Sequence, residues 1–169
     1  DTTFAFVMRE GTAYRLRPEA DVWLDAVEFE RACEQGLRVG DLGQLRSALR
    51  LYRGDYLPDA LYEDWASEER ERLLSLYLRA ADKLAGLLIE RGEHDEALDI
   101  CQAILARDAC WERAYRLMMT AHARQGNRPL ALRAYQRCTT TLRDELGVEP
   151  SATTTALYRQ IAQSDEAPA

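Results

Sequence analysis

The sequence has little lysine, few cysteines and histidines, and no long hydrophobic run. Lys83 is the only lysine, and we attribute the excess of arginine to a composition bias rather than to a site. No apolar stretch approaches the ~18 residues that a membrane span requires. The four cysteines (Cys33, Cys101, Cys110, Cys138) form no CxxC pair, and the two histidines lie far apart, so zinc-ligand spacing is absent. These absences predict reduced thiols, no metal, no membrane contact and a cytoplasmic protein.

Motifs of catalysis are also missing. The sequence contains no GxSxG elbow, no phosphate-binding glycine loop and no HExxH zinc motif. Cys101 and Cys110 are close in sequence, but we interpret them as buried, unreactive thiols rather than as a redox pair. His94 stands between two acidic residues at an expected helix start, where a solvated helix terminus is the simpler interpretation. We therefore expect no enzyme activity and no cofactor.

Length and charge narrow the class further. The 169 residues are enough for one domain with a real core and the edge of a second. With 29 acidic and 22 basic residues, the formal net charge is −7 and the pI is about 5.0. A protein that grips nucleic acid over a broad surface needs a basic face. The charge therefore argues against DNA binding by this chain itself.

The first 18 residues predict a β-hairpin. A β-prone run at 4–8 is followed by a turn at 9–12 and an alternating run at 13–17, which Pro18 ends. An isolated hairpin is barely stable in water, so we expect it to pack on another part of the protein. Residues 1–18 are interpreted as the remnant of a preceding domain. The alternative is a hairpin that belongs to the helical domain.

The rest of the chain has helical periodicity. Apolar residues follow helical spacing at 25–40 and again at 42–52, and turn residues break the pattern at 53–59. Further helices are expected at 64–91, 94–107, 111–125, 128–146 and 152–163, with Ser151 as the N-cap of the last. The short connections indicate antiparallel neighbours. The small, acidic segment 164–169 is expected to be a disordered tail.

An internal repeat is the most informative pattern. Glycine, four residues and Ala-Leu recur at Gly43, Gly92 and Gly126, and the last two glycines are 34 positions apart, since 126 − 92 = 34. This is the tetratricopeptide period of two antiparallel helices per repeat. The first interval, 92 − 43 = 49, is longer by 15 positions and contains the break at 53–59. We expect glycine to end the first helix of each pair and alanine to allow close crossing.

The predicted architecture is therefore all-α: three tetratricopeptide-like helix pairs over 19–163, a capping final helix and a concave inner face. A plain helical bundle is the alternative. We expect Trp65 to anchor the long helix against the first pair, and Trp23 and Trp111 to be packing residues.

Basic residues are dense in the third repeat. Arg113, Arg116 and Arg124, with His122 among them, form a possible interaction or ligand face. An ordinary solvated surface is the alternative for the arginines, and core or groove lining is the alternative for His122. As a signal for nucleic-acid binding these arginines are weak, because acidic residues surround them and no aromatic residues are interleaved with them.

Several blocks resemble a known family. Residues 49–57 (LRLYRGDYL), 65–70 (WASEER), 131–135 (ALRAY) and 145–150 (ELGVEP) are similar to the bacterial transcriptional activator domain of SARP-type regulators. The ELGVEP block is the most specific of them, and the resemblance covers about residues 21–163. In that family a winged helix-turn-helix domain precedes this domain and ends in a hairpin. Residues 11–16 (GTAYRL) are similar to its last strand, with the glycine displaced.

The resemblance implies a protein-interaction and activation domain of a bacterial transcriptional regulator. The implied partners are a second copy of the chain, RNA polymerase subunits, or both. DNA binding is implied only through a winged-helix domain that this chain does not contain. The alternative function, suggested by the arginines of the third repeat, is a signal-sensing domain that binds a small ligand or peptide in the concave face.

Overall fold

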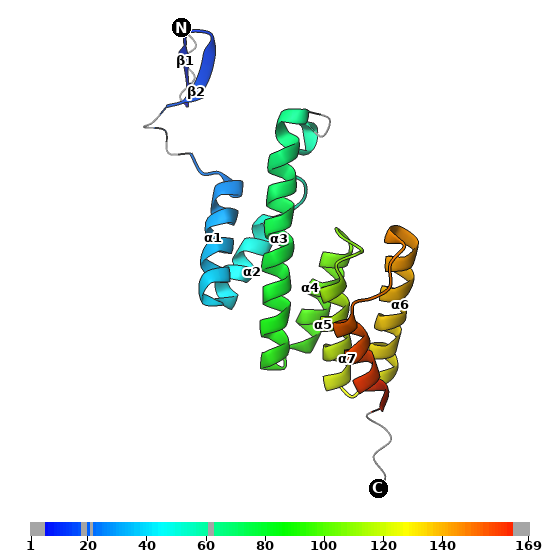
Figure 1. The fold of residues 1–169 in the computed structure, drawn as a ribbon. Helices are drawn as coiled ribbons and strands as arrows, with labels where there is room; N and C mark the ends of the chain where they lie inside the picture. The colour runs from blue at the N-terminus through cyan, green and yellow to red at the C-terminus, as the bar shows by residue number, and fades with distance from the viewer. Residues whose placement is uncertain (1–5, 18–19, 21, 61–62, 164–169) are drawn as a thin grey trace.

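The computed structural model describes residues 6–17, 20, 22–60 and 63–163 as a short hairpin followed by a row of helices (Figure 1). The predicted tail at 164–169 and the first residues of the predicted hairpin lie outside the described residues. Among the residues that are described, no helix is both long enough and apolar enough to cross a membrane.

The N-terminal hairpin forms as predicted, with a shorter turn. Strands β1 (Val7–Glu10) and β2 (Ala13–Leu16) are antiparallel, and Glu10 pairs with Ala13. The turn is therefore residues 11–12 rather than 9–12, and Gly11 takes a φ of 64°, which glycine adopts without steric cost. The hairpin stands away from the helices, and Phe6 and Tyr14 are mostly exposed (Figure 1). The expected packing of the hairpin is thus not seen among the described residues.

Helices make up the remainder of the described chain and agree closely with the predicted ranges. They are α1 (Asp25–Val39), α2 (Leu42–Leu51), α3 (Asp64–Arg91), α4 (His94–Leu105), α5 (Glu112–Arg124), α6 (Arg128–Leu146) and α7 (Ala152–Gln163). A 3-10 turn, η1 (Pro58–Ala60), interrupts the loop between α2 and α3. The Ser151 hydroxyl accepts a hydrogen bond from the Thr154 N–H at 3.4 Å, as expected of an N-cap.

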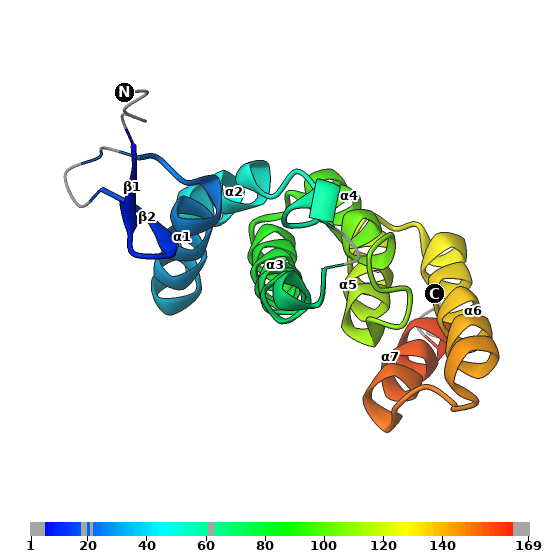
Figure 2. The ribbon, with the colours of Figure 1, turned by 90° about the horizontal axis from the view of Figure 1, so that it is seen from above.

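The helices pack as three antiparallel pairs and a cap, which confirms the predicted architecture. α1 packs on α2, α3 on α4 and α5 on α6, and α7 covers the last pair. One continuous core runs through all three pairs. Figure 2 shows α1, α3, α5 and α7 along one side of the row and α2, α4 and α6 along the other. The row bends toward the first side at α7, so α1, α3, α5 and α7 form the inner face.

Glycine ends the first helix of each pair, but in the first pair it is not the predicted glycine. Gly92 and Gly126 have φ values of 80° and 72°, as expected. In the first pair Gly40 is the left-handed residue after α1, with a φ of 70°, whereas Gly43 lies inside α2. The prediction for Gly43 is wrong. Its spacing to the Ala-Leu pair matches the other two repeats by coincidence, because the glycine that ends the first helix, Gly40, lies about one helical turn earlier in the chain.

The close helix crossing in the first pair uses a different residue. Gly36 of α1 lies against Leu45 of α2, and a Cβ on Gly36 would come within 2.7 Å of Leu45 Cγ. In the other two pairs the fully buried small residues Ala97 and Ala131 stand near the start of the second helix, as predicted. In the first pair, therefore, the small residue that lets the two helices approach closely lies on the first helix, α1, instead of on the second helix.

Candidate protein-interaction surfaces

The predicted basic face on α5 is divided into two groups. Arg113 and Arg116 lie near the start of α5, and His122 and Arg124 lie near its end. Arg113 and Arg124 are about 16 Å apart along the helix axis. Arg124 Nη1 donates to the carbonyl of Ile89 at 2.8 Å, so the Arg124 side chain is held between α5 and α3. The four residues do not form one site.

Arg113 and Arg116 line a groove of about 420 Å³ between α5 and α7 on the inner face. The other lining residues are Leu117, Thr120, Thr153, Ala156, Leu157 and Gln160. Arg113 Nε is 2.8 Å from Asp82 Oδ2, yet its side chain stays 55% exposed and accessible to an anion. This groove is the part of the predicted face that has the shape of a binding site.

Glu112 holds the capping helix against α5. Its Oε1 accepts hydrogen bonds from the N–H and hydroxyl of Ser151, at 2.9 and 2.6 Å, and from the hydroxyl of buried Thr154. Arg116 Nη1 donates to Thr154 Oγ1 at 3.0 Å. Burial alone would raise the pKa of Glu112, but the hydrogen bonds from Ser151 and Thr154 outweigh it and lower the pKa. Arg116 is thus tied into the cap.

A second groove, of about 600 Å³, separates α1 from α3 on the same inner face. Arg38, Arg72 and Arg79 line it together with Glu34. Arg72 bonds Glu30 and Glu69, while Arg38 and Arg79 have no partner among the described residues. These arginines are not among the residues predicted from the sequence, although the spacing of Arg72 and Arg79 places them on one face of a helix and could have indicated them.

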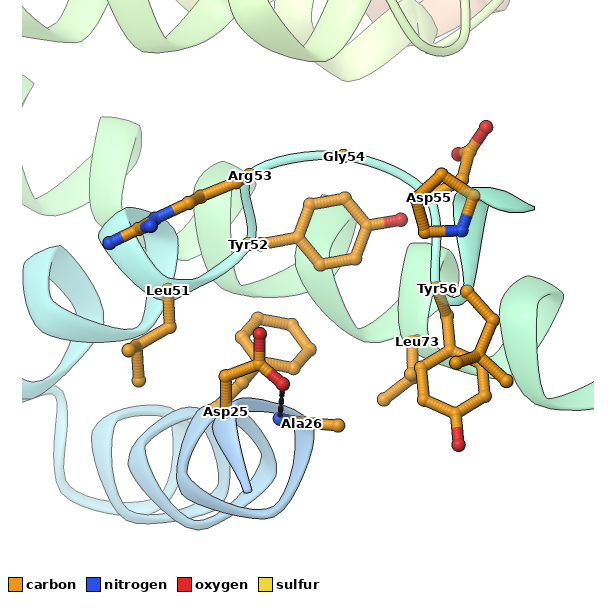
Figure 3. Close-up of a pocket in the computed structure, with 12 residues that line it drawn as sticks. Asp25, Ala26, Leu51, Tyr52, Arg53, Gly54, Asp55, Tyr56 and Leu73 are labelled. Atoms are coloured by element: carbon orange, nitrogen blue, oxygen red, sulfur yellow. Dashed lines mark hydrogen bonds between the residues drawn. The ribbon is translucent and has the colours of Figure 1, made fainter. Parts of the chain in front are cut away.

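An apolar pocket of about 500 Å³ lies under the loop that joins α2 to α3 (Figure 3). Asp25, Ala26 and Phe29 of α1 and Leu73 of α3 line it, and residues 51–58 supply the remaining wall. Arg70 Nε donates to the carbonyl of Tyr56 at 3.3 Å and so secures the loop to α3. The LYRGDYL block that carries the family resemblance is therefore the wall of a pocket.

Tyr52 is the central residue of this pocket. Its ring packs between Phe29 and Tyr77, with centroids 5.3 and 4.6 Å away, and the Arg107 guanidinium lies 5.4 Å from the Tyr52 ring and 4.4 Å from the Tyr77 ring. Tyr52 is only 9% exposed, and its hydroxyl has no hydrogen-bond partner among the described residues. Burial, followed by the Asp55 carboxylate, raises the pKa of Tyr52, so the hydroxyl stays protonated. A buried hydroxyl without a partner is costly unless something binds it.

Large apolar side chains are exposed at the same end of the molecule. We call this surface the open end; it comprises Trp23, Leu24, Val27, Leu57 and Trp65. They lie at or just before the starts of α1 and α3 and in the loop between α2 and α3, and Leu57 of this loop also lines the pocket. Leu57 also has a φ of 51°, the one positive value among the described non-glycine residues. Clustered exposed apolar residues mark interaction sites.

Two of the three tryptophan predictions are wrong. Trp65 is 68% exposed and does not anchor α3, because its neighbour Ala66 occupies the packed side of the first turn at 1% exposure. Trp23 precedes α1 and is 66% exposed. Trp111 packs against the core as expected, and its Nε1 donates to Asp82 Oδ1 at 3.3 Å.

The cysteines and histidines form no reactive group. All four thiols are free, and burial raises the pKa of Cys33, Cys101 and Cys138 to about 12. This supports the interpretation of Cys101 as a buried, unreactive thiol, whereas Cys110 is only partly buried. His94 and His122 are partly buried, and the Nδ1 atom of each is buried without a partner among the described residues. His94 is therefore less solvated than expected.

Comparison with known proteins identifies the family of the chain. Residues 24–162 match the family described as the bacterial transcriptional activator domain. The chain is 33% identical over 148 residues to the regulatory protein DnrI of Streptomyces peucetius, covering 83% of this chain and 54% of DnrI. It is 30% identical over 162 residues to the transcriptional regulatory protein MoaR1 of Mycobacterium tuberculosis, covering 92% and 52%.

A solved structure shares the fold. The Mycobacterium tuberculosis protein EmbR, in complex with a low-affinity phosphopeptide, superimposes with a TM-score of 0.76 at 25% identity, covering 94% of this chain and 43% of EmbR. The chain spans about half the length of DnrI and MoaR1. Its relatives are transcriptional regulators rather than enzymes, and the chain belongs to the bacterial transcriptional activator domain family of SARP-type regulators.

Proposed function

We propose that this chain is the protein-interaction and activation domain of a cytoplasmic transcriptional regulator. It acts through self-association, through contact with RNA polymerase, or through both. DNA binding resides in a winged-helix domain that precedes residue 1, and the exposed hairpin is the edge of that domain. The matched region covers only 54% of DnrI and 52% of MoaR1, which supports the presence of further domains in the parent protein.

The open end is the observation that carries this proposal. Trp23 and Trp65 are 66% and 68% exposed, and they stand beside a pocket with apolar walls. Tryptophan is among the residues most enriched in the energetic centres of protein interfaces. An isolated domain gains nothing in stability from exposing two such side chains, so we expect them to be covered by another protein or by the domain that precedes residue 1.

Two binding measurements test the proposal. Sedimentation velocity over a range of concentrations measures self-association, and immobilised chain with purified RNA polymerase measures polymerase contact. We expect the double variant Trp23→Ser and Trp65→Ser to lose whichever association the parent chain shows. The control Val39→Ser removes an exposed apolar residue at the far end of α1 and should bind normally. If the parent chain neither self-associates nor binds polymerase, the proposal is wrong.

A signal-sensing function is the second candidate, and the groove between α5 and α7 favours it. Arg113 provides an exposed cation there, with Thr120 and Gln160 as further polar groups. A small anionic metabolite is the ligand class that this lining suits. A thermal-shift screen of anionic metabolites tests it, with Arg113→Gln as the variant that should lose the response. No stabilisation by any compound would exclude this second function.

A further inference from the structure

The groove between α1 and α3 is lined by three arginines and by one carboxylate. We call it the basic groove; its lining residues are Glu34, Leu37, Arg38, Arg72, Ser75, Leu76 and Arg79. Arg72 is bound to Glu30 and Glu69, whereas Arg38 and Arg79 form no ion pair with any described residue. In a chain whose net charge is −7, two exposed and unpaired arginines in one groove are a local excess of positive charge.

The unpaired arginines lie at the same level of the groove. Arg72 of α3 bonds Glu30 of α1, which fixes where the two helices meet. Both helices run in the same direction (Figure 1), so Arg38, eight residues after Glu30, lies level with Arg79, seven residues after Arg72. Lys83, one turn beyond Arg79, is exposed on the same face of α3. An anion between the two helices therefore meets positive charge on both sides.

The positive charge continues from the basic groove toward α5. Gly86 lies seven residues after Arg79 and so on the same face of α3. It has no side chain, and a Cβ there would meet Arg113 Nη2 at 4.0 Å and nothing nearer. Arg113 is 55% exposed despite its ion pair with Asp82. The inner face thus carries exposed cations from α1 across α3 to α5.

An extended acidic segment matches this arrangement. Arg79 and Lys83 are about 6 Å apart along the axis of α3. Alternate residues of an extended chain are about 6.5–7 Å apart, so carboxylates at alternate positions meet successive cations. Leu37 and Leu76 give the basic groove an apolar floor, beside which ion pairs are stronger than in open water.

Nucleic acid matches the basic groove less well. Single strands are held by aromatic side chains that stack on the bases, and the residues that line the basic groove include no aromatic one. A row of phosphates would also pass Glu34 and the two carboxylates bound to Arg72. A peptide avoids this repulsion, because its charges can be spaced to face only the unpaired cations.

We propose that the basic groove binds an extended, acidic segment of a partner protein, whose alternate carboxylates pair with Arg38, Arg79 and Lys83. This inference rests on the protein-interaction part of the proposed function, and it assigns a second surface, on the inner face and away from the open end. The contact is made largely by exposed charges, so its affinity falls as salt is added.

Fluorescence anisotropy of a labelled peptide tests the proposal. The probe carries glutamates at alternate positions with serines between them, and the reference peptide carries glutamine in place of each glutamate. We expect the parent chain to bind the glutamate peptide at least about tenfold more tightly, and to lose most of this preference when NaCl is raised to about 1 M. Equal affinity for the two peptides, or no binding of either, would overturn the inference.

Charge reversal locates the contact. Arg38→Glu with Arg79→Glu should weaken binding of the glutamate peptide at least about tenfold and create binding of a peptide with lysines at the same positions. Loss of the fold cannot produce a new specificity. The matched control, Arg50→Glu with Arg133→Glu, makes the same change of net charge at exposed positions of α2 and α6 and should keep the parent preference. If the control behaves like the groove variant, only net charge matters and the inference is wrong.

Two further measurements separate this inference from its rivals. A single-stranded oligonucleotide of similar charge should bind more weakly than the glutamate peptide; tighter binding that the groove variant abolishes would assign the basic groove to nucleic acid and overturn the inference. Self-association and polymerase binding are measured on the same chains. If either is present in a parent chain that binds no glutamate peptide, the inference fails and the proposed function stands. If the peptide binds but both associations are absent, the proposed partners are wrong and the groove contact stands.

Discussion

The two ends of the helical row differ in how they meet solvent. At the C-terminal end, α7 covers the last pair, Ile161 is buried, and the rings of Tyr135 and Tyr158 stack with centroids 4.1 Å apart. Arg128 also donates from α6 to the carbonyls of Ile161, at 3.1 Å, and Ala162, at 2.5 Å. At the open end, tryptophans are exposed around a pocket. The open end is formed by the starts of α1 and α3 and the loop between α2 and α3, and its exposed apolar side chains indicate a contact surface.

The largest expected difference comes from shortening one apolar side chain at each end. Ile161→Ala leaves a cavity under α7 and should lower the free energy of unfolding by about 2–5 kcal/mol. Val27→Ala removes two methyl groups from a side chain that is 53% exposed and should change it by less than about 0.5 kcal/mol. Urea denaturation measures both. Equal losses would show that the two ends are covered alike.

Crowding at the first helix pair should give the next largest effect. Gly36→Ala places a Cβ 2.7 Å from Leu45 Cγ and should cost about 1–3 kcal/mol of unfolding free energy. Gly86→Ala is the matched control, because its Cβ would meet nothing nearer than Arg113 Nη2 at 4.0 Å. It should stabilise the chain by about 0.5–1 kcal/mol, since alanine is the better helix former. Thermal unfolding distinguishes these opposite signs.

A smaller and pH-dependent effect is expected at the closed end. The pKa of Glu112 is lower in the folded chain than its ordinary value of 4.5, so the unfolded chain binds the proton more readily. The stabilisation by this carboxylate is therefore complete above about pH 5 and is lost as the pH falls through the folded pKa. Glu112→Gln should cost about 1 kcal/mol at neutral pH and reduce the acid sensitivity of unfolding. An unchanged pH profile would contradict this.

The smallest effect on stability is expected from the double variant Trp23→Ser and Trp65→Ser. Both side chains are mostly exposed, so the free energy of unfolding of the dilute monomer should change by less than about 0.5 kcal/mol. Chemical denaturation at low concentration measures it. A larger loss would mean that the open end is structural after all.

Helix positions were predictable because local signals and periodicity agree. The left-handed glycine Gly147 and the apolar spacing fix the end of α6, and Asp41 caps α2 by accepting a hydrogen bond from the Gln44 N–H at 3.0 Å. Gly43 shows the limit of spacing alone, since a match of glycine to Ala-Leu cannot tell a helix end from a helix interior. The glycine that ends α1 is Gly40, two residues before α2 begins.

The surfaces were less predictable than the helices. The place of Trp65 after the break at 53–59 predicts that it anchors α3, but Ala66 occupies the packed side of the first turn, and tertiary contacts decide which residue does so. The basic cluster was read from sequence proximity, whereas Arg113 and Arg124 face different junctions of the fold. The pocket was invisible because its walls come from α1, the α2–α3 loop and α3. Sequence order does not show which segments meet.

The position of Arg107 has a consequence for binding in the pocket. This residue follows α4, yet its guanidinium covers the ring of Tyr52, which forms the pocket wall at the other side of α3. A guest that moves the Tyr52 ring would therefore have to break a contact worth about 0.5–2 kcal/mol, and its affinity for the pocket would be lower by that cost.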